Sequence, residues 1–368
     1  MQKDKVKITL GGTSASVLGC LWGRAQMSRE YRSLFYDAKA IELTEKIDYV
    51  PDFSASDVQP FEDVMINIFF SHKINQTRFG LFTLRAKQFD YKVKAYIEEH
   101  PYASVINIAA GLDTTFYRVD DGLIHWYDLD LPAVIDIRRQ LLPEPDRVIY
   151  IAKSLLDPNW FEDVTYTEDG VFMIAGGVLH SLEESQVKQF FSMLADNFPD
   201  GEIVFDAMSR LGGGFRGRID MFPPEQRDAM RATLIDALKG WWEEVLKDWW
   251  KKAPQDEKDK VSDIVATLKI PTKLKGKEWS DLEAWWDQIS DTEKAEALND
   301  LMTAFGGKVG TWSVKDANEI TKLNSHITVI DQFPLFKNVP RDSLSADIQR
   351  VMDYSDENGG SNIIHLRV

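Results

Sequence analysis

The chain of 368 residues has almost no cysteine, no long apolar run and no excess of positive charge. Its one cysteine, Cys20, excludes an internal disulfide and a zinc site built from several cysteines, which fits a reducing compartment. No segment approaches the roughly 18 uninterrupted apolar residues that a membrane-spanning helix needs. The formal net charge of −16 argues against nucleic acid as a main partner, because phosphate binding needs a cationic surface.

Apolar residues make up 44% of the chain and charged residues 28%, proportions that are ordinary for a soluble globular protein. The length favours one large α/β domain with inserted elements. The N-terminal stretch superficially resembles a secretory signal, but Gly-Gly-Thr-Ser interrupts its apolar part. We therefore interpret it as part of the mature protein and expect a cytoplasmic location without a membrane partner.

Short apolar runs alternate with helix-like segments in the middle of the chain, a pattern that predicts a parallel sheet with right-handed crossovers. Strands are expected at 104–109, 123–128, 147–152, 170–175, 202–207, 325–331 and 363–368. Helices are expected at 132–142 and 183–197, between strands of this series. We expect the last strand to join the edge of the sheet in an antiparallel direction.

The remaining segments are predicted to be helical and to flank or interrupt this core. Residues 13–50, with Thr13 or Ser14 as a helix cap, and residues 61–100 form an N-terminal extension. This gives an extension over 1–100, a core over 101–210 and 306–368, and a helical insertion over 211–305.

The predicted insertion is rich in tryptophan, since seven of the eleven tryptophans fall between 241 and 286. Most of them are expected to pack the insertion onto the core. The insertion is also a candidate lid over a hydrophobic substrate. Trp249 and Trp250 are alternatively candidates for a pocket wall or a homodimer face.

The most informative segment lies between residues 104 and 132. It contains an apolar strand, a turn with Gly111 and Asp113, and a second apolar strand that ends in Asp128 and Asp130. This order is typical of a site for an adenosine-type cofactor, because a small turn lets the ligand approach and a following acid can accept both ribose hydroxyls. The alternative is that Gly111 is a simple turn glycine and that the acids only cap the next helix.

The residues after Gly111 lack the further glycines of a nicotinamide-binding turn. Their absence argues against a ligand with a pyrophosphate and against a nicotinamide-dependent oxidoreductase. A cofactor without phosphates fits this turn better, and S-adenosylmethionine is such a cofactor.

An ordered series of motifs then resembles a known family. The motifs are Arg24-Ala25, Asp37-Ala38-Lys39-Ala40, LRAKQFD around Arg85, AAGLDTTFYR, YDLDLP, SLLDPNW, AGGVLHSL and FPDGEIVFDAMS. Together they resemble the leucine carboxyl methyltransferase family, in particular its bacterial branch with tetracenomycin-type polyketide O-methyltransferases. The resemblance covers about residues 13–210 and, more weakly, 310–368. It implies a class I methyltransferase fold, that is, a seven-stranded, mostly parallel sheet with helices on both faces, and S-adenosylmethionine as methyl donor.

The resemblance also implies roles for single residues in binding the cofactor. Arg85 matches the arginine that holds the methionine carboxylate, a task that suits a guanidinium because it can donate two parallel hydrogen bonds. Gly111 matches the glycine beneath the cofactor, and Asp113 belongs to the same turn. Asp130 matches the acid that binds the ribose hydroxyls, with Asp128 as the alternative.

Two positions depart from the family pattern. Ser154-Leu155 stands where an aspartate and a leucine often contact the adenine, and Gly176 stands where a glutamate often follows the fourth strand. Both are retained as expected cofactor contacts. The departures argue against the branch that methylates protein carboxyl groups.

The transfer of the methyl group is expected to need few catalytic groups of the protein, because the donor carries its own leaving group. His180, after the fourth strand, is the candidate base for a hydroxyl acceptor, with a structural histidine at a helix start as the alternative. Asp206, at the end of the fifth strand, is a second candidate base and is also an expected substrate contact. A carboxylate acceptor needs no base.

Arg24 and Tyr31 are candidate substrate contacts on an N-terminal segment expected to close over the site. An arginine there could hold an anionic substrate, and a surface ion pair is its alternative role. The sequence thus predicts an S-adenosylmethionine-dependent O-methyltransferase acting on a small-molecule hydroxyl or carboxyl group. A non-catalytic cofactor-binding or interaction protein on the same fold is the alternative.

Overall fold

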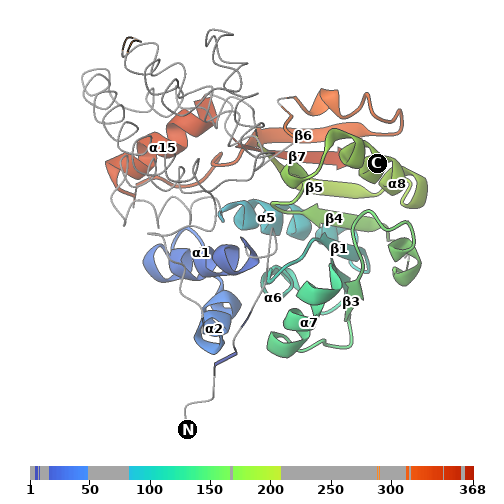
Figure 1. Ribbon diagram of the computed structural model, residues 1–368, viewed down its shortest axis with the longest axis horizontal. Helices are drawn as coiled ribbons and strands as arrows, with labels where there is room; N and C mark the ends of the chain where they lie inside the picture. Colours follow the sequence, from blue (N-terminus) through green and yellow to red (C-terminus); the bar gives the residue numbers. More distant parts are fainter. Residues whose placement is uncertain are drawn as a thin grey trace. The chain divides into compact units, whose positions relative to one another are not determined.

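A seven-stranded sheet organises the part of the chain that the computed structural model describes (Figure 1). The described residues are 16–48, 83–165, 169–208, 312–314, 316–342, 344–357 and 361–368, with the single positions 5, 6, 8, 288 and 290. The expected caps Thr13 and Ser14, the first part of the helix predicted at 61–100 and nearly all of the tryptophan-rich insertion lie outside them.

The strands follow the predicted positions closely. They are β1 (Ser104–Ile108), β2 (His125–Asp130), β3 (Val148–Ala152), β4 (Val171–Ala175), β5 (Glu202–Met208), β6 (Thr328–Pro334) and β7 (Ser361–Arg367). Their order in the sheet is β3-β2-β1-β4-β5-β7-β6, and β1 to β5 run parallel to one another. The predicted fold class, a mostly parallel seven-stranded sheet, is confirmed.

The last strand does not lie where the sequence suggested. β7 is antiparallel to its neighbours as expected, but it lies between β5 and β6, so that β6 forms the edge of the sheet. The burial of the two strands explains this order. β7 is buried over Ser361–Leu366, whereas β6 has exposed positions such as Ile330 and an irregular register between Val329 and Asp331. Irregular, partly exposed strands are typical of sheet edges.

Successive residues of the strands point to opposite faces, and each face carries its own hydrophobic core. One core contains Val105 of β1 with side chains of α5 (Arg85–Glu99), α7 (Pro132–Leu141) and α15 (Ala346–Glu357). The other contains Ile106 with side chains of α8 (Glu184–Asn197) and of the short 3₁₀ segments. These segments are η2 (Trp160–Asp163), η3 (Leu179–Ser181) and η6 (Ala317–Glu319). The sheet is therefore the middle of three layers.

The N-terminal helices α1 (Ser16–Glu30) and α2 (Ala38–Lys46) form a smaller hydrophobic cluster of their own. This cluster includes Leu112, which follows β1, and Leu141 at the end of α7. Asp37 is the N-cap residue of α2, and its Oδ1 accepts a hydrogen bond of 2.8 Å from the Ala40 amide. The N-terminal helices are thus attached to the sheet at the turn after β1. None of the described helices is both long and apolar enough to cross a membrane.

The core beneath α8 gives a direct test of the three-layer arrangement. Phe190 is fully buried there, so Phe190→Ala should lower the free energy of unfolding by about 3–5 kcal/mol through lost apolar burial and a cavity. Tyr91 on α5 is 67% exposed, and Tyr91→Ala should change it by less than about 0.5 kcal/mol. Chemical denaturation measures both variants. Equal, small effects would contradict the assignment of this face as core.

Candidate functional site

Most of the predicted site residues lie at one end of the sheet, where the parallel strands β1 to β5 finish. In an open α/β sheet, ligands bind in the crevice beyond the carboxyl ends of the strands. This crevice lies where the connections that follow two adjacent parallel strands run to opposite sides of the sheet. Here that point lies between β1 and β4, which are adjacent. The predicted residues that follow or end these strands are Gly111, Asp113, Asp130, Ser154, Gly176 and Asp206.

The turn after β1 has an unusual backbone. Gly111 has φ 51° and Ala109 has φ 52°, in the left-handed region that residues other than glycine rarely adopt. A β-carbon at Gly111 would lie 3.2 Å from Cγ2 of Val17 in α1, so the glycine also permits the close approach of α1. A turn of this shape requires neighbours that hold it in place.

Hydrogen bonds hold both backbone groups of Gly111, its N–H and its carbonyl. Its N–H donates to Asp130 Oδ2 at 2.7 Å, and its carbonyl accepts from Arg138 Nη1 at 3.0 Å. Arg138, on α7, also donates to the carbonyl of Asp113 at 2.8 Å. The turn is therefore joined both to β2 and to the helix that follows it.

The two acids at the end of β2 have different environments. Asp130 is partly exposed and, among the described residues, accepts only the amides of Gly111 and Leu131, so each of its oxygens keeps a lone pair for a further donor. Asp128 is 1% exposed. Its oxygens accept from Asn107, Trp126 and twice from Arg138. The expected contact with ribose hydroxyls therefore depends on Asp130, and Asp128 does not fit as the alternative.

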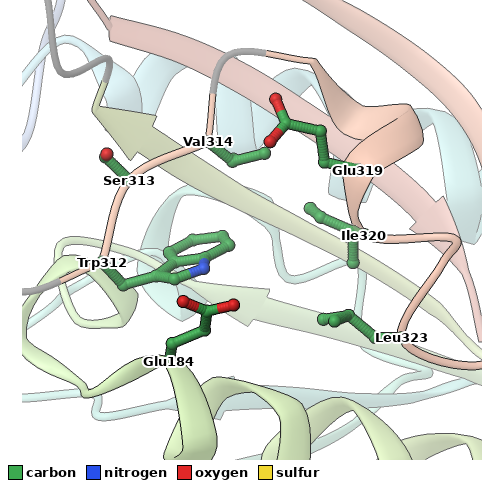
Figure 2. Close-up of a pocket in the computed structure, with 7 residues that line it drawn as sticks. All are labelled: Glu184, Trp312, Ser313, Val314, Glu319, Ile320 and Leu323. Carbon is green, nitrogen blue, oxygen red and sulfur yellow. The ribbon is translucent and has the colours of Figure 1, made fainter.

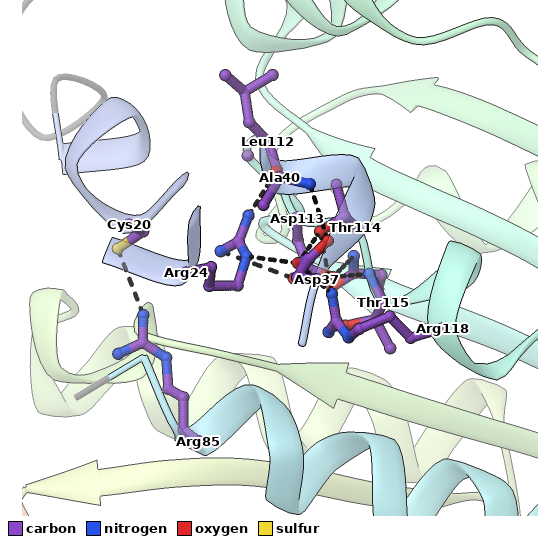
Figure 3. A network of polar contacts seen from close by, with 12 residues as sticks. Cys20, Arg24, Asp37, Ala40, Arg85, Leu112, Asp113, Thr114, Thr115 and Arg118 are labelled. Atoms are coloured by element: carbon purple, nitrogen blue, oxygen red, sulfur yellow. Dashed lines mark hydrogen bonds and ion pairs between the residues drawn. The ribbon is translucent and has the colours of Figure 1, made fainter. Parts of the chain in front are cut away.

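A buried network of charges joins α1 and α2 to the same turn (Figure 3). Its centre is Asp37, which is fully buried and whose Oδ2 accepts from Thr114 Oγ1 at 2.5 Å and from Arg118 Nη1 at 2.6 Å. Arg118 also forms two hydrogen bonds to Asp90 of α5, at 2.7 and 2.9 Å. Burial raises the pKa of Asp113, but the charges of Arg24 and Arg118 outweigh this and hold it well below its ordinary value.

The structure places Arg24 in this buried network. Its side chain is 7% exposed, its Nη2 donates to the carbonyl of Leu112 at 2.6 Å, and its Nε lies 3.3 Å from Asp37 Oδ2. Arg24 is therefore not a surface ion pair but belongs to the network that fastens α1 to the turn, and its contact with a substrate stays a prediction. Tyr31, the other expected substrate contact, is partly buried against the core that contains α5.

A second corner of the site lies where α5 begins. Arg85 Nη2 lies 3.5 Å from Cys20 Sγ, and Arg85 Nη1 lies 3.9 Å from Asp206 Oδ2. Asp206 Oδ1 accepts the amide of Gly177, which has φ 71°. The corner therefore combines a cation from α5 with a carboxylate from β5.

Close packing explains why glycine stands at positions 176 and 177 of this corner. A β-carbon at Gly177 would lie 2.6 Å from Arg85 Nη2, and one at Gly176 would lie 2.8 Å from Cε2 of Phe89. The side chains of Arg85 and Phe89 therefore fill the space in which a residue at 176 or 177 would project. This gives a steric reason for Gly176 at the position where the family resemblance implies a glutamate.

His180 lies in η3, after β4. Its Nδ1 is buried and has no hydrogen-bond partner among the described residues. Burial lowers the pKa of His180, the charge of Asp206 opposes this, and Arg85 adds to the lowering. The imidazole is therefore mainly neutral near pH 7, the form that can accept a proton.

Ser154 follows β3 and takes part in a local turn. Its hydroxyl accepts from the Leu156 amide at 3.2 Å, and its carbonyl accepts from the Asp157 amide at 2.9 Å. The hydroxyl can still donate one hydrogen bond. Leu155 packs at the border of the core that contains α8. Both residues therefore remain compatible with a contact to adenine.

A pocket of about 140 Å³ lies between α8 and the segment 312–323 (Figure 2). Trp312 forms one wall beside Glu184, with Glu319, Ile320 and Leu323 opposite. The Trp312 amide is directed at the carbonyl of His180, at 3.4 Å, so the pocket borders η3. None of the residues predicted from the sequence lines this pocket.

Four charged residues that shape the site received no role from the sequence, although the first three stand in the motifs quoted above: Asp37, Asp90, Arg118 and Arg138. Arg138 had a recognisable signal, because it lies four residues after Val134 and three before Leu141, on the buried stripe of α7. An arginine on such a stripe needs buried partners. The other three are recognised as partners only once the chain is folded.

Comparison with known proteins identifies the family of this chain. Residues 18–195 match the model of a family described as leucine carboxyl methyltransferase. The tetracenomycin polyketide synthesis O-methyltransferase TcmP of Streptomyces glaucescens is 30% identical over 202 residues, which cover 55% of this chain and 68% of that protein. An S-adenosyl-L-methionine-dependent methyltransferase, dpfgK, of Gibberella zeae is 28% identical over 221 residues, covering 55% and 69%.

Among solved structures, a DUF574 family protein from Streptomyces avermitilis aligns with 94% of this chain and 96% of its own, at 10% identity and a TM-score of 0.42. The family assignment comes from the sequence matches, and the matched range contains Arg85, the Gly111 turn, Asp130 and His180. On this evidence the chain belongs to the leucine carboxyl methyltransferase family and is a methyltransferase.

Proposed function

We propose that the chain is an S-adenosylmethionine-dependent O-methyltransferase whose acceptor is a small-molecule hydroxyl or carboxyl group, of polyketide or similar secondary-metabolite type. The observation that carries the cofactor site is the Gly111 turn, held against Asp130 at the point where the sheet order reverses. The acceptor class is supported by the likeness to the tetracenomycin O-methyltransferase.

The residues at this end of the sheet fit the chemical groups of the cofactor. Asp130 has lone pairs for the ribose hydroxyls, and Arg85 has a guanidinium for the methionine carboxylate. Ser154 and Leu155 are the proposed adenine contacts. When bound, S-adenosylmethionine supplies an activated methyl group on a sulfonium. The turn lacks the glycines that a pyrophosphate needs, which supports this cofactor over a nicotinamide dinucleotide.

His180 is the proposed base for a hydroxyl acceptor. It is mainly neutral near pH 7, and its Nδ1 has no partner among the described residues. Removal of the hydroxyl proton raises the nucleophilicity of the acceptor oxygen, and Asp206 stabilises the imidazolium that results. For a carboxylate acceptor the same corner would only position the substrate.

The test of the cofactor is calorimetric titration with S-adenosylhomocysteine, with NADH as the control ligand. We expect S-adenosylhomocysteine to bind with a Kd in the micromolar range and NADH not to bind. An absence of heat at millimolar S-adenosylhomocysteine would overturn the proposed function. Binding of NADH would instead favour an oxidoreductase.

The proposed contact of Arg85 with the cofactor can be tested by a substitution at Gly177, which lies against the Arg85 guanidinium. Gly177→Ala should weaken S-adenosylhomocysteine binding about tenfold, because the added methyl group displaces the Arg85 guanidinium. Gly122→Ala is the matched control, since Gly122 also has a positive φ but a β-carbon there meets no atom of the described residues within 4 Å. Both variants should lose roughly 1 kcal/mol of stability through backbone strain. Equal affinities in the two variants would contradict the role of Arg85.

The pH dependence of turnover tests His180. Because the pKa of His180 is lowered, the base form persists at neutral pH, and kcat should fall only below the ordinary histidine pKa of 6.5. His180→Ala should remove this acidic limb and reduce kcat at neutral pH by roughly a hundredfold or more. Asp206→Asn should move the limb to lower pH, since the Asp206 charge favours the imidazolium. Exposed His326 provides the control variant, His326→Ala. An unchanged profile in His180→Ala would exclude the base role.

A further inference from the structure

We infer that Arg138 is a positioning residue of the cofactor site, which keeps the Gly111 turn in the conformation that receives the cofactor. The inference rests on the proposed function, because it assumes that the cofactor lies against this turn. Arg138 is not among the residues that the family resemblance assigned to the site. Its role follows from its contacts.

The guanidinium of Arg138 donates hydrogen bonds both to Asp128 and to the turn after β1. Its Nε and Nη2 donate to Asp128 Oδ2, at 3.0 and 2.5 Å. Its Nη1 donates to the carbonyls of Gly111 and Asp113, at 3.0 and 2.8 Å. The side chain is 2% exposed, so water does not compete for these bonds. A planar fork of donors is required for this arrangement, and arginine alone among the side chains provides it.

The turn that Arg138 holds needs such support. Ala109 and Gly111 both have left-handed backbones, and for alanine this conformation is unfavourable. The Gly111 N–H is already fixed by Asp130, the proposed ribose contact. Arg138 fixes the carbonyl of the same residue. Together they set both ends of Gly111, and thereby the distance between the turn and Asp130.

Asp128 in turn holds Arg138 in place. Its Oδ1 accepts from Trp126 Nε1 at 2.9 Å and from Asn107 Nδ2 at 3.0 Å, which orients the carboxylate towards α7. Asn107 Nδ2 also donates to Asp113 Oδ2 at 3.2 Å. The contacts run from the centre of the sheet through Asp128 and Arg138 to the turn.

The competing explanation is that Arg138 only neutralises the buried charge of Asp128. Arg138→Lys separates the two roles, because a lysine ammonium can pair with Asp128 but lacks the second arm for the carbonyls. The control is Arg139→Lys, one residue along α7, where the side chain is 45% exposed and pairs with Asp136 and Glu144 at 3.9 and 3.7 Å.

We expect Arg138→Lys to raise the Kd for S-adenosylhomocysteine about tenfold in calorimetry, and to raise KM for S-adenosylmethionine with little change in kcat. In the ligand-free protein, hydrogen exchange in a peptide covering residues 109–115 should be faster in this variant. Arg139→Lys should match the wild type within about twofold in each measurement. Unchanged affinity and exchange in a folded Arg138→Lys protein, even one with lowered thermal stability, would overturn the inference.

A second variant decides the matter if Arg138→Lys does not fold. The double change Asp128→Asn with Arg138→Gln removes both charges and leaves no unpaired ion. It should raise the same Kd about tenfold, and wild-type affinity in it would overturn the inference. If the wild-type protein itself does not bind S-adenosylhomocysteine, the proposed function fails. The exchange comparison on the ligand-free variants still shows whether Arg138 holds the turn.

Discussion

The buried pair of Asp128 and Arg138 is the interaction on which the geometry of the site depends. A buried ion pair is weak evidence for stability, because removing both charges from water offsets much of their attraction. Its effect here is geometric. Trp126, Asp128 and Asp130 alternate along β2 and share one face of the sheet. The first belongs to the core, the second anchors Arg138, and the third meets the turn directly. One strand face therefore sets the core and the site together.

The N-terminal helices depend on a second buried set of charges, centred on Asp37. Each ion in this set has an opposite partner, which is the condition for burying charge. Asp113 belongs to it, and its pKa lies well below the ordinary value. The stabilisation that it contributes is thus fully present above the pKa of an unfolded aspartate and is lost as the pH falls below it. Since Val17 of α1 also lies close to Gly111, α1 packs directly against the turn.

Local patterns predicted the strands well, because buried parallel strands are continuous apolar runs between turns. They did not predict that β7 would lie between β5 and β6, since the order of strands depends on contacts between distant segments. The site shows the same limit. Asp128 and Asp130 look alike in sequence, and only Arg138, which reaches back from α7, separates their roles. Arg24 was assigned to the substrate because its partners, Asp37 and Leu112, meet it only in the folded chain.

The corner around Arg85 combines glycines after β4 with a carboxylate from the neighbouring strand β5. Gly176 stands where the family resemblance implies a glutamate, and a β-carbon there would lie 2.8 Å from Cε2 of Phe89. A carboxylate is nevertheless present at this corner, because Asp206 reaches it from β5 and faces both Arg85 and the Gly177 amide. The same charge acts on His180. Gly176 therefore leaves this corner with a carboxylate, which comes from the neighbouring strand β5.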